Sequence, residues 1–216
     1  MAANEREIPL FPLRAVLFPG AAIPMNVFEQ RYRTMMDEVL AGDSTFGIVL
    51  IRVGHEVGGP AVPVDVGTLA RVEGLQRRPD GTMTFRAVGV QRFRIRELLR
   101  DRPFLRGRVE LLEEDASPIR QELPGQVLEA FFAYLEAASG LTGGWLHEWC
   151  QAADAPTLSY VVAFYMRAMP QIKQGLLEQD SHQKRLEEEL TLLKHETELL
   201  RQAPQSRGME RPFNLN

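Results

Sequence analysis

The chain has 216 residues and a formal net charge of −4, with 44% apolar and 25% charged residues. This composition is typical of a folded globular protein and excludes a disordered one. No apolar run approaches the roughly 18 residues that a membrane helix requires, and the charged opening MAANERE excludes a secretory signal peptide. We therefore expect a cytoplasmic protein with one large domain or two modest ones.

Cysteine, histidine and arginine usage narrows the possible chemistry. Cys150 is the one cysteine, so no intrachain disulfide forms, and we expect it to be a buried apolar residue. The four histidines lack metal-ligand spacing, so we expect no metal and no cofactor. Residues 71–108 carry eleven arginines against four acidic residues. This local excess predicts either an anionic partner or acidic segments that face the arginines.

The first apolar stretch, IPLFPLRAVLFPG at residues 8–20, contains three prolines. Pro9 and Pro12 exclude a helix interior because they remove backbone donors and bias the preceding residues towards extended geometry. The apolar residues 13–18 predict a short buried strand, and Pro19 with Gly20 predicts a turn. We interpret the stretch as a bent strand that begins a β-domain.

One helix is expected among the strands that follow. Residues 21–29 are extended, and then apolar residues recur at helical spacing from Tyr32 to Leu40, with Gly42 placed to end the helix. Residues 45–53 form a β-branched run typical of a buried strand. Segments on either side of Pro79-Asp80-Gly81 predict a hairpin. In the next strand, apolar residues alternate with Arg92, Arg94 and Arg96, which predicts a row of guanidinium groups on the solvent face.

These elements predict a twisted β-barrel with one inserted helix over residues 7–115, followed by a helical subdomain over 116–202 and a mobile tail over 203–216. Helical periodicity begins at Leu123 and again at Leu158, where Asp154 or Thr157 is a candidate N-cap. A long last helix carries a leucine seam. Its outer side is expected to include Glu187, Glu188 and Glu189.

The order of these pieces resembles the amino-terminal substrate-binding domain of Lon proteases. The resemblance is carried by IPLFPLRAVLFPGAAIPMNVFEQRYRTMMDEV, FGIVLI, VGTLARVEG, DGTMTFRAVGVQRFRI and KQGLLEQDSHQKRLEEELTLLKHE. It implies a PUA-like barrel joined to helices, in a free-standing form. Neither a GxxxxGK[ST] motif nor a Ser-Lys peptidase dyad is expected in this chain, so the resemblance implies binding of unfolded or tagged polypeptides, or of another protein partner, without catalysis.

Three functions are compared. The first is binding of apolar polypeptide segments; candidate residues are Met25, Phe28, Tyr32, Met35 and Met36. An apolar helix stripe is more often core, so these residues need an exposed patch to act as a site. The alternative is RNA binding through Arg92, Arg94 and Arg96, which the acidic total charge and the general preference for arginine over lysine disfavour.

The third function is hydrolysis, for which the sequence offers no nucleophile and base at recognisable spacing. We expect no membrane partner, and a monomer or weak homo-oligomer.

Overall fold

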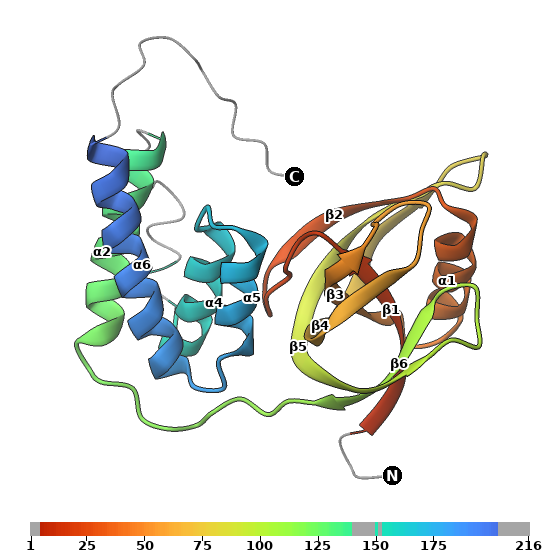
Figure 1. Cartoon of the computed structure of the whole chain (residues 1–216), viewed down its shortest axis with the longest axis horizontal. Helices are drawn as coiled ribbons and strands as arrows, with labels where there is room; N and C mark the ends of the chain where they lie inside the picture. The colour runs from red at the N-terminus through yellow and green to blue at the C-terminus, as the bar shows by residue number, and fades with distance from the viewer. Residues whose placement is uncertain (1–4, 140–149, 151–152, 203–216) are drawn as a thin grey trace. The chain divides into compact units, whose positions relative to one another are not determined.

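The structure is a computed structural model that describes residues 5–139, 150 and 153–202, and the chain divides into two compact units (Figure 1). The barrel unit extends to Glu114 and also contains Arg167–Glu178, whereas the helical unit contains Asp115–Met166 and the residues from Gln179 onwards. The sequence predicts a boundary after residue 115 and assigns residues 167–178 to the helical part. The expected mobile tail, 203–216, lies outside the described residues.

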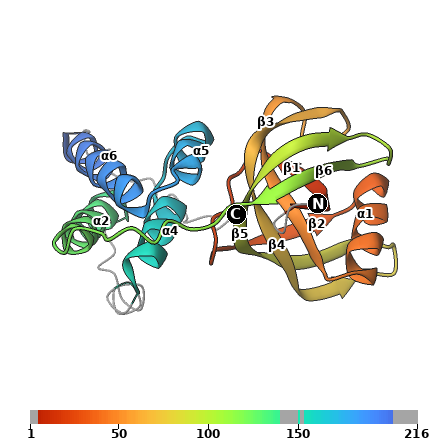
Figure 2. The same cartoon turned by 90° about the horizontal axis from the view of Figure 1, so that it is seen from below.

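Six strands form the barrel unit. They are β1 (Glu5–Leu13), β2 (Ala22–Val27), β3 (Thr45–Gly54), β4 (Ala61–Arg77), β5 (Met83–Leu99) and β6 (Leu105–Leu111). Their order is β2-β5-β4-β3-β1-β6, and an additional β5–β6 pairing closes the sheet, as Figure 2 shows from below. The predicted α+β fold is therefore confirmed. Strand β2 pairs with β5 alone, so it is an edge strand.

Strand β1 lies earlier in the chain than the sequence predicts. The strand covers residues 5–13 and contains both Pro9 and Pro12. Residues 14–21 form the connection between β1 and β2, in which Val16, Leu17 and Phe18 are buried. Residues 5–10 pair with β6 and residues 10–13 pair with β3. Each half of β1 is thus paired along one edge, and such partly paired strands tolerate proline. Of the apolar run at 13–18, Leu13 ends β1, and residues 14–18 are a connection whose apolar side chains are buried at Val16, Leu17 and Phe18.

The inserted helix and the hairpin follow the predicted pattern. Helix α1 spans Gln30–Ala41 and ends at Gly42, and its buried residues include Met35 and Met36. The β4–β5 turn uses Gly81 at a φ of +82°, a conformation that glycine adopts without steric cost. Helix α1 packs against β1 and β3, and the core of the barrel surrounds the stacked rings of Phe11 and Tyr32, whose centroids are 4.0 Å apart.

A short helix, α5 (Pro170–Glu178), belongs to the barrel unit. Its Gln174 Nε2 donates a hydrogen bond of 3.0 Å to the Val66 carbonyl of β4. The carbonyl of Leu177 accepts a 3.0 Å hydrogen bond from the guanidinium of Arg92 on β5. Two polar contacts thus join α5 to neighbouring strands of the barrel.

The helical unit contains α2 (Leu123–Ser139), α4 (Ala155–Tyr165) and α6 (His182–Gln202) among its described residues. Asp154 caps α4, because its carboxylate accepts a 2.9 Å hydrogen bond from the Thr157 amide. Helix α6 packs on α2 and α4. Its buried face carries polar residues as well as leucines, and Glu189 is fully buried there rather than on the outer side.

Candidate functional site

The five apolar residues singled out from the sequence divide into core and surface. Tyr32, Met35 and Met36 lie on the inner face of α1, and Met25 points inward from β2; all four are at most 7% exposed. Phe28, between the end of β2 and the start of α1, is 54% exposed. The strand period accounts for this: Met25 and Val27 point inward, so Phe28 falls on the outward set. That alternation was a usable signal in the sequence.

Phe28 lines a cavity of about 160 Å³ that we call the β2 cavity. Its lining residues are Phe11, Leu13, Pro24, Met25, Asn26, Val27, Phe28, Glu29, Tyr32, Glu56 and Val57. Six consecutive residues, 24–29, line it although neighbouring strand residues point to opposite faces, so the cavity runs along the edge of β2. Val57, in the β3–β4 connection, adds a second exposed apolar side chain, at 57% exposure.

A polar network centred on Arg31 joins residues that line the β2 cavity, among them Glu29 and Tyr32. The guanidinium of Arg31 lies 4.5 Å above the Tyr32 ring and 3.2 Å from the Glu29 carboxylate, and it donates a 2.8 Å hydrogen bond to the Gly59 carbonyl. Glu29 also accepts a hydrogen bond from the Gly58 amide. Burial raises the pKa of Tyr32, and Arg31 opposes that shift. The β3–β4 connection is thereby fixed against the start of α1, which preorganises the cavity.

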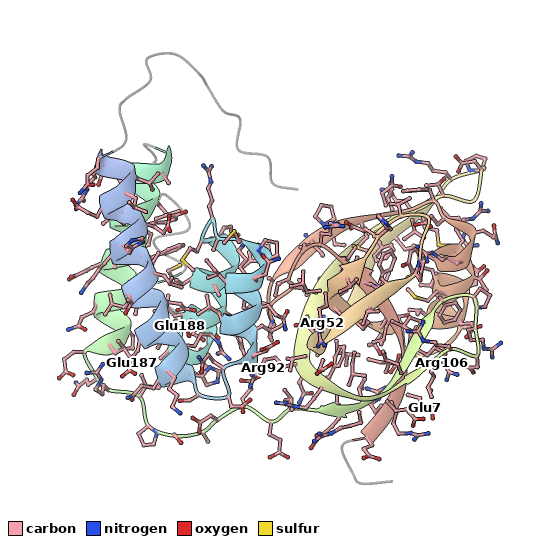
Figure 3. All side chains as sticks on the ribbon, viewed as in Figure 1. Glu7, Arg52, Arg92, Arg106, Glu187 and Glu188 are labelled. Carbon is pink, nitrogen blue, oxygen red and sulfur yellow. The ribbon has the colours of Figure 1, made fainter. Side chains whose placement is uncertain are left out.

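The three arginines predicted to form one solvent-facing row occupy three different environments. Arg92 is fully buried: it donates hydrogen bonds to Glu114 and to the Leu177 carbonyl of α5. Arg94 is half-buried, and Arg96 is exposed and forms an ion pair with Glu110. Figure 3 shows Arg92 among the labelled side chains. The alternation of β5 places Arg92 outward, but α5 then covers it.

Many other arginines of residues 71–108 face acidic side chains, which is one of the two arrangements predicted from the local excess of positive charge. The ion pairs on the barrel surface include Arg71–Glu73, Arg77–Asp37, Arg86–Glu73, Arg106–Glu7, Arg106–Asp101, Arg108–Glu7 and Arg108–Glu97. Glu7 and Arg106 are labelled in Figure 3. The local excess of positive charge is thus partly neutralised within the barrel.

One buried cluster brings a hydroxyl close to an imidazole, which the sequence did not reveal. Ser159 Oγ lies 3.4 Å from His182 Nδ1, and Arg185 approaches both, at 3.1 and 3.0 Å. Ser159 and Arg185 are fully buried and His182 is 3% exposed, so a substrate has no access to the pair. The guanidinium of Arg185 also stacks on Tyr160, with 4.3 Å to the ring centroid. We interpret the cluster as packing of α4 against α6.

The described residues offer no group of three or more His, Cys, Asp or Glu side chains that could hold a metal ion. None of the helices described is both long and apolar enough to cross a membrane. Cys150 is buried, and this burial raises the pKa of its thiol to about 11, so the thiolate nucleophile is scarce at neutral pH.

Comparison with known proteins gives consistent results. The model of the ATP-dependent protease La (LON) substrate-binding domain matches residues 7–195. The Lon protease of Syntrophus aciditrophicus is 27% identical over 203 residues, which are 89% of this chain and 25% of that protein. The chain thus spans about a quarter of the length of this relative.

Two solved structures are similar to the chain. The crystal structure of a Lon N-terminal domain protein from Xanthomonas campestris has a TM-score of 0.67 and 29% identity, covering 86% of this chain and 98% of that one. The N-terminal domain of a Mycobacterium avium complex Lon protease has a TM-score of 0.65 at 17% identity, covering 89% of this chain and 98% of that chain. The second likeness concerns the fold alone.

Proposed function

The chain belongs to the family of ATP-dependent protease La (LON) substrate-binding domains, and from this premise we propose that it binds exposed apolar segments of other polypeptides without cleaving them. The match is to the substrate-binding part of Lon proteases and not to their catalytic part. One observation carries the proposal: the exposed ring of Phe28 borders the β2 cavity. Phe28 and Val57, both more than half exposed, line this cavity together, and exposed apolar patches of this kind occur at binding surfaces.

We assign the β2 cavity to an extended segment of the bound polypeptide. The free edge of β2 offers backbone donors and acceptors, and an extended chain pairs with such an edge while its alternate side chains enter pockets. The walls formed by Met25 and Tyr32 suit an apolar side chain, and the thioether of Met25 adapts to several shapes. Met35 and Met36 support the site from the core without touching the client.

Fluorescence anisotropy tests this function. A dye-labelled, permanently unfolded polypeptide and a dye-labelled single-stranded RNA are titrated with the protein at low and at physiological salt. We expect polypeptide binding that survives salt, because apolar contacts are not screened, and no RNA binding. RNA binding with a steep salt dependence, or binding of neither probe, contradicts the proposal.

A matched pair of variants locates the site. Phe28→Ser removes the exposed ring, and we expect it to weaken polypeptide binding about tenfold, which corresponds to about 1.4 kcal/mol. Val90→Ser is the control, since Val90 of β5 is 45% exposed and does not line the β2 cavity. Equal effects of the two substitutions would place the binding surface elsewhere.

A further inference from the structure

A second cavity of the barrel unit, of about 260 Å³, adjoins the β2 cavity, and we call it the arginine cavity. Its lining residues are Pro12, Arg31, Tyr32, Pro60, Ala61, Arg100, Arg102, Pro103, Phe104 and Leu105. Tyr32 lines both cavities, and β1 contributes Pro12 to this one but Phe11 and Leu13 to the other. The two cavities are therefore neighbours along β1, and one extended segment can reach both.

The two cavities differ in charge. Three arginines line the arginine cavity, and none of the described residues that line it is acidic. The β2 cavity instead has Glu29 and Glu56 in its lining and no arginine there. A carboxylate is therefore attracted to the first cavity and repelled from the second.

Two of the three arginines are available to a ligand. Arg31 is held by Glu29 and by backbone carbonyls. Arg102 is 3.8 Å from the Glu38 carboxylate in an exposed ion pair, a kind of contact that contributes little stability. Arg100 is exposed and forms no hydrogen bond or ion pair with a described residue. A pair of guanidinium groups on one concave surface suits a carboxylate, which accepts two parallel hydrogen bonds from one arginine.

We propose that the arginine cavity binds an acidic side chain, Asp or Glu, of the same polypeptide whose apolar side chain enters the β2 cavity. This inference rests on the proposed function and gives it a client class: extended segments in which an acidic residue adjoins an apolar one. The unlike charges of the two cavities fix the direction in which such a segment lies. Because Tyr32 lines both cavities, the two anchored side chains lie close together along the bound segment.

Three labelled peptides test this inference by fluorescence anisotropy. All are short and extended with the same alternating Leu and Phe residues; the first has an adjoining Asp and an amidated C-terminus. The second has Asn in place of Asp and is also amidated, and the third has Asn and a free C-terminal carboxylate. We expect the Asp peptide to bind about tenfold more tightly than the amidated Asn peptide. That preference should shrink with added salt, because the Asp carboxylate and the arginines that it meets lie near the surface.

Variants separate the two cavities. The double substitution Arg100→Gln with Arg102→Gln is expected to abolish the preference for Asp while leaving the affinity for the amidated Asn peptide unchanged. Phe28→Ser is expected to weaken binding of the Asp peptide and of the amidated Asn peptide by the same factor. Arg120→Gln is the control, because Arg120 is an equally exposed, ion-paired arginine of the helical unit. The thermal midpoint of each variant verifies that it is folded.

The outcomes are distinguishable. Equal binding of the Asp and amidated Asn peptides, both weakened by Phe28→Ser, overturns the arginine-cavity proposal and leaves the proposed function in place. A preference for the free C-terminal carboxylate over the Asp side chain also overturns it, since the anchored group would then be a chain end. Binding of none of the peptides refutes the proposed function and the carboxylate site with it.

Discussion

Glu189 of α6 provides the sharpest test of the energetics of the helical unit. Its side chain is fully buried, and neither carboxyl oxygen has a hydrogen-bond partner among the described residues. Arg185 lies one turn earlier on the same face, but its guanidinium donates to Ser159 and to the Gln179 carbonyl instead. Burial raises the pKa of Glu189 well above its usual value, and the positive charge of Arg185 opposes that shift.

The raised pKa makes the stability of the protein fall as pH rises. Above the usual pKa of about 4.5, the unfolded chain has lost the Glu189 proton while the folded chain still holds it. The free energy of unfolding therefore decreases by about 1.4 kcal/mol for each pH unit from this group. The decrease begins near pH 4.5 and ends at the pKa of the folded state. Below pH 4.5, Glu189 no longer lowers the free energy of unfolding through its ionisation.

Glu189→Met removes the carboxyl and keeps the length of the side chain. Because an unsatisfied buried polar group costs about 1–3 kcal/mol, we expect the variant to be more stable by that amount at pH 4, where Glu189 is mostly protonated in both states of the wild type. The gain should be larger at pH 7, because the pH-dependent loss of wild-type stability adds to it. Urea unfolding followed by far-UV circular dichroism between pH 4 and 7 measures both quantities.

Glu198→Met is the matched control, since Glu198 is an exposed carboxylate of the same helix. Its replacement should leave the free energy of unfolding at pH 7 nearly unchanged, because surface substitutions have small effects. Parallel stability curves for the wild type and Glu189→Met would refute the reasoning, and so would a variant that is less stable at pH 7. Either result would mean that Glu189 is ionised and stabilised in the folded protein.

Three further predictions concern the barrel core and the thiol. Arg92→Met leaves the exposed Glu114 carboxylate and the Leu177 carbonyl of α5 without their donor, so we expect a loss of about 1–3 kcal/mol and faster amide hydrogen exchange in α5; unchanged protection there would contradict the role of Arg92. Gly89→Ala places a Cβ in steric conflict with the Phe18 carbonyl oxygen, so the melting temperature should fall; an unchanged midpoint would contradict the close approach. Cys150 should react with iodoacetamide at pH 8 far more slowly in the native protein than in urea, whereas fast native labelling would argue against its burial.

Local periodicity accounts for the part of the fold that the sequence predicts. The helical spacing from Tyr32 and the Pro79-Asp80-Gly81 turn each depend on neighbouring residues, and α1 and the β4–β5 hairpin form where these patterns lie. Helix α5 was not predicted. It has nine residues and begins at Pro170, which in the sequence reads as the end of the preceding helix. Its contacts with Val66 and Arg92 lie far away in the chain, so no local pattern indicates them.

The same limit applies to the candidate site, where contacts with distant elements decide which predicted residues are exposed. Periodicity assigns a residue to a face but does not say whether another element covers that face. Arg92 and Phe28 both fall on outward sets of their strands. Helix α5 covers Arg92, whereas Phe28 remains half exposed. The sequence therefore named Phe28 among five apolar candidates without separating it from the four that are buried.

The contrast between these two outward residues supports a functional explanation for Phe28. Covering Arg92 requires hydrogen bonds from its guanidinium, because a buried charge without partners is strongly destabilising, and the fold supplies Glu114 and the Leu177 carbonyl. Phe28 has the opposite chemistry: a polar residue would satisfy an exposed position, yet the chain places an aromatic ring there. Its apolar surface contributes nothing to folding while it faces water. The free energy of burying the exposed part of that ring is thus available to a bound polypeptide, and Phe28→Ser should weaken binding while lowering the melting temperature only slightly.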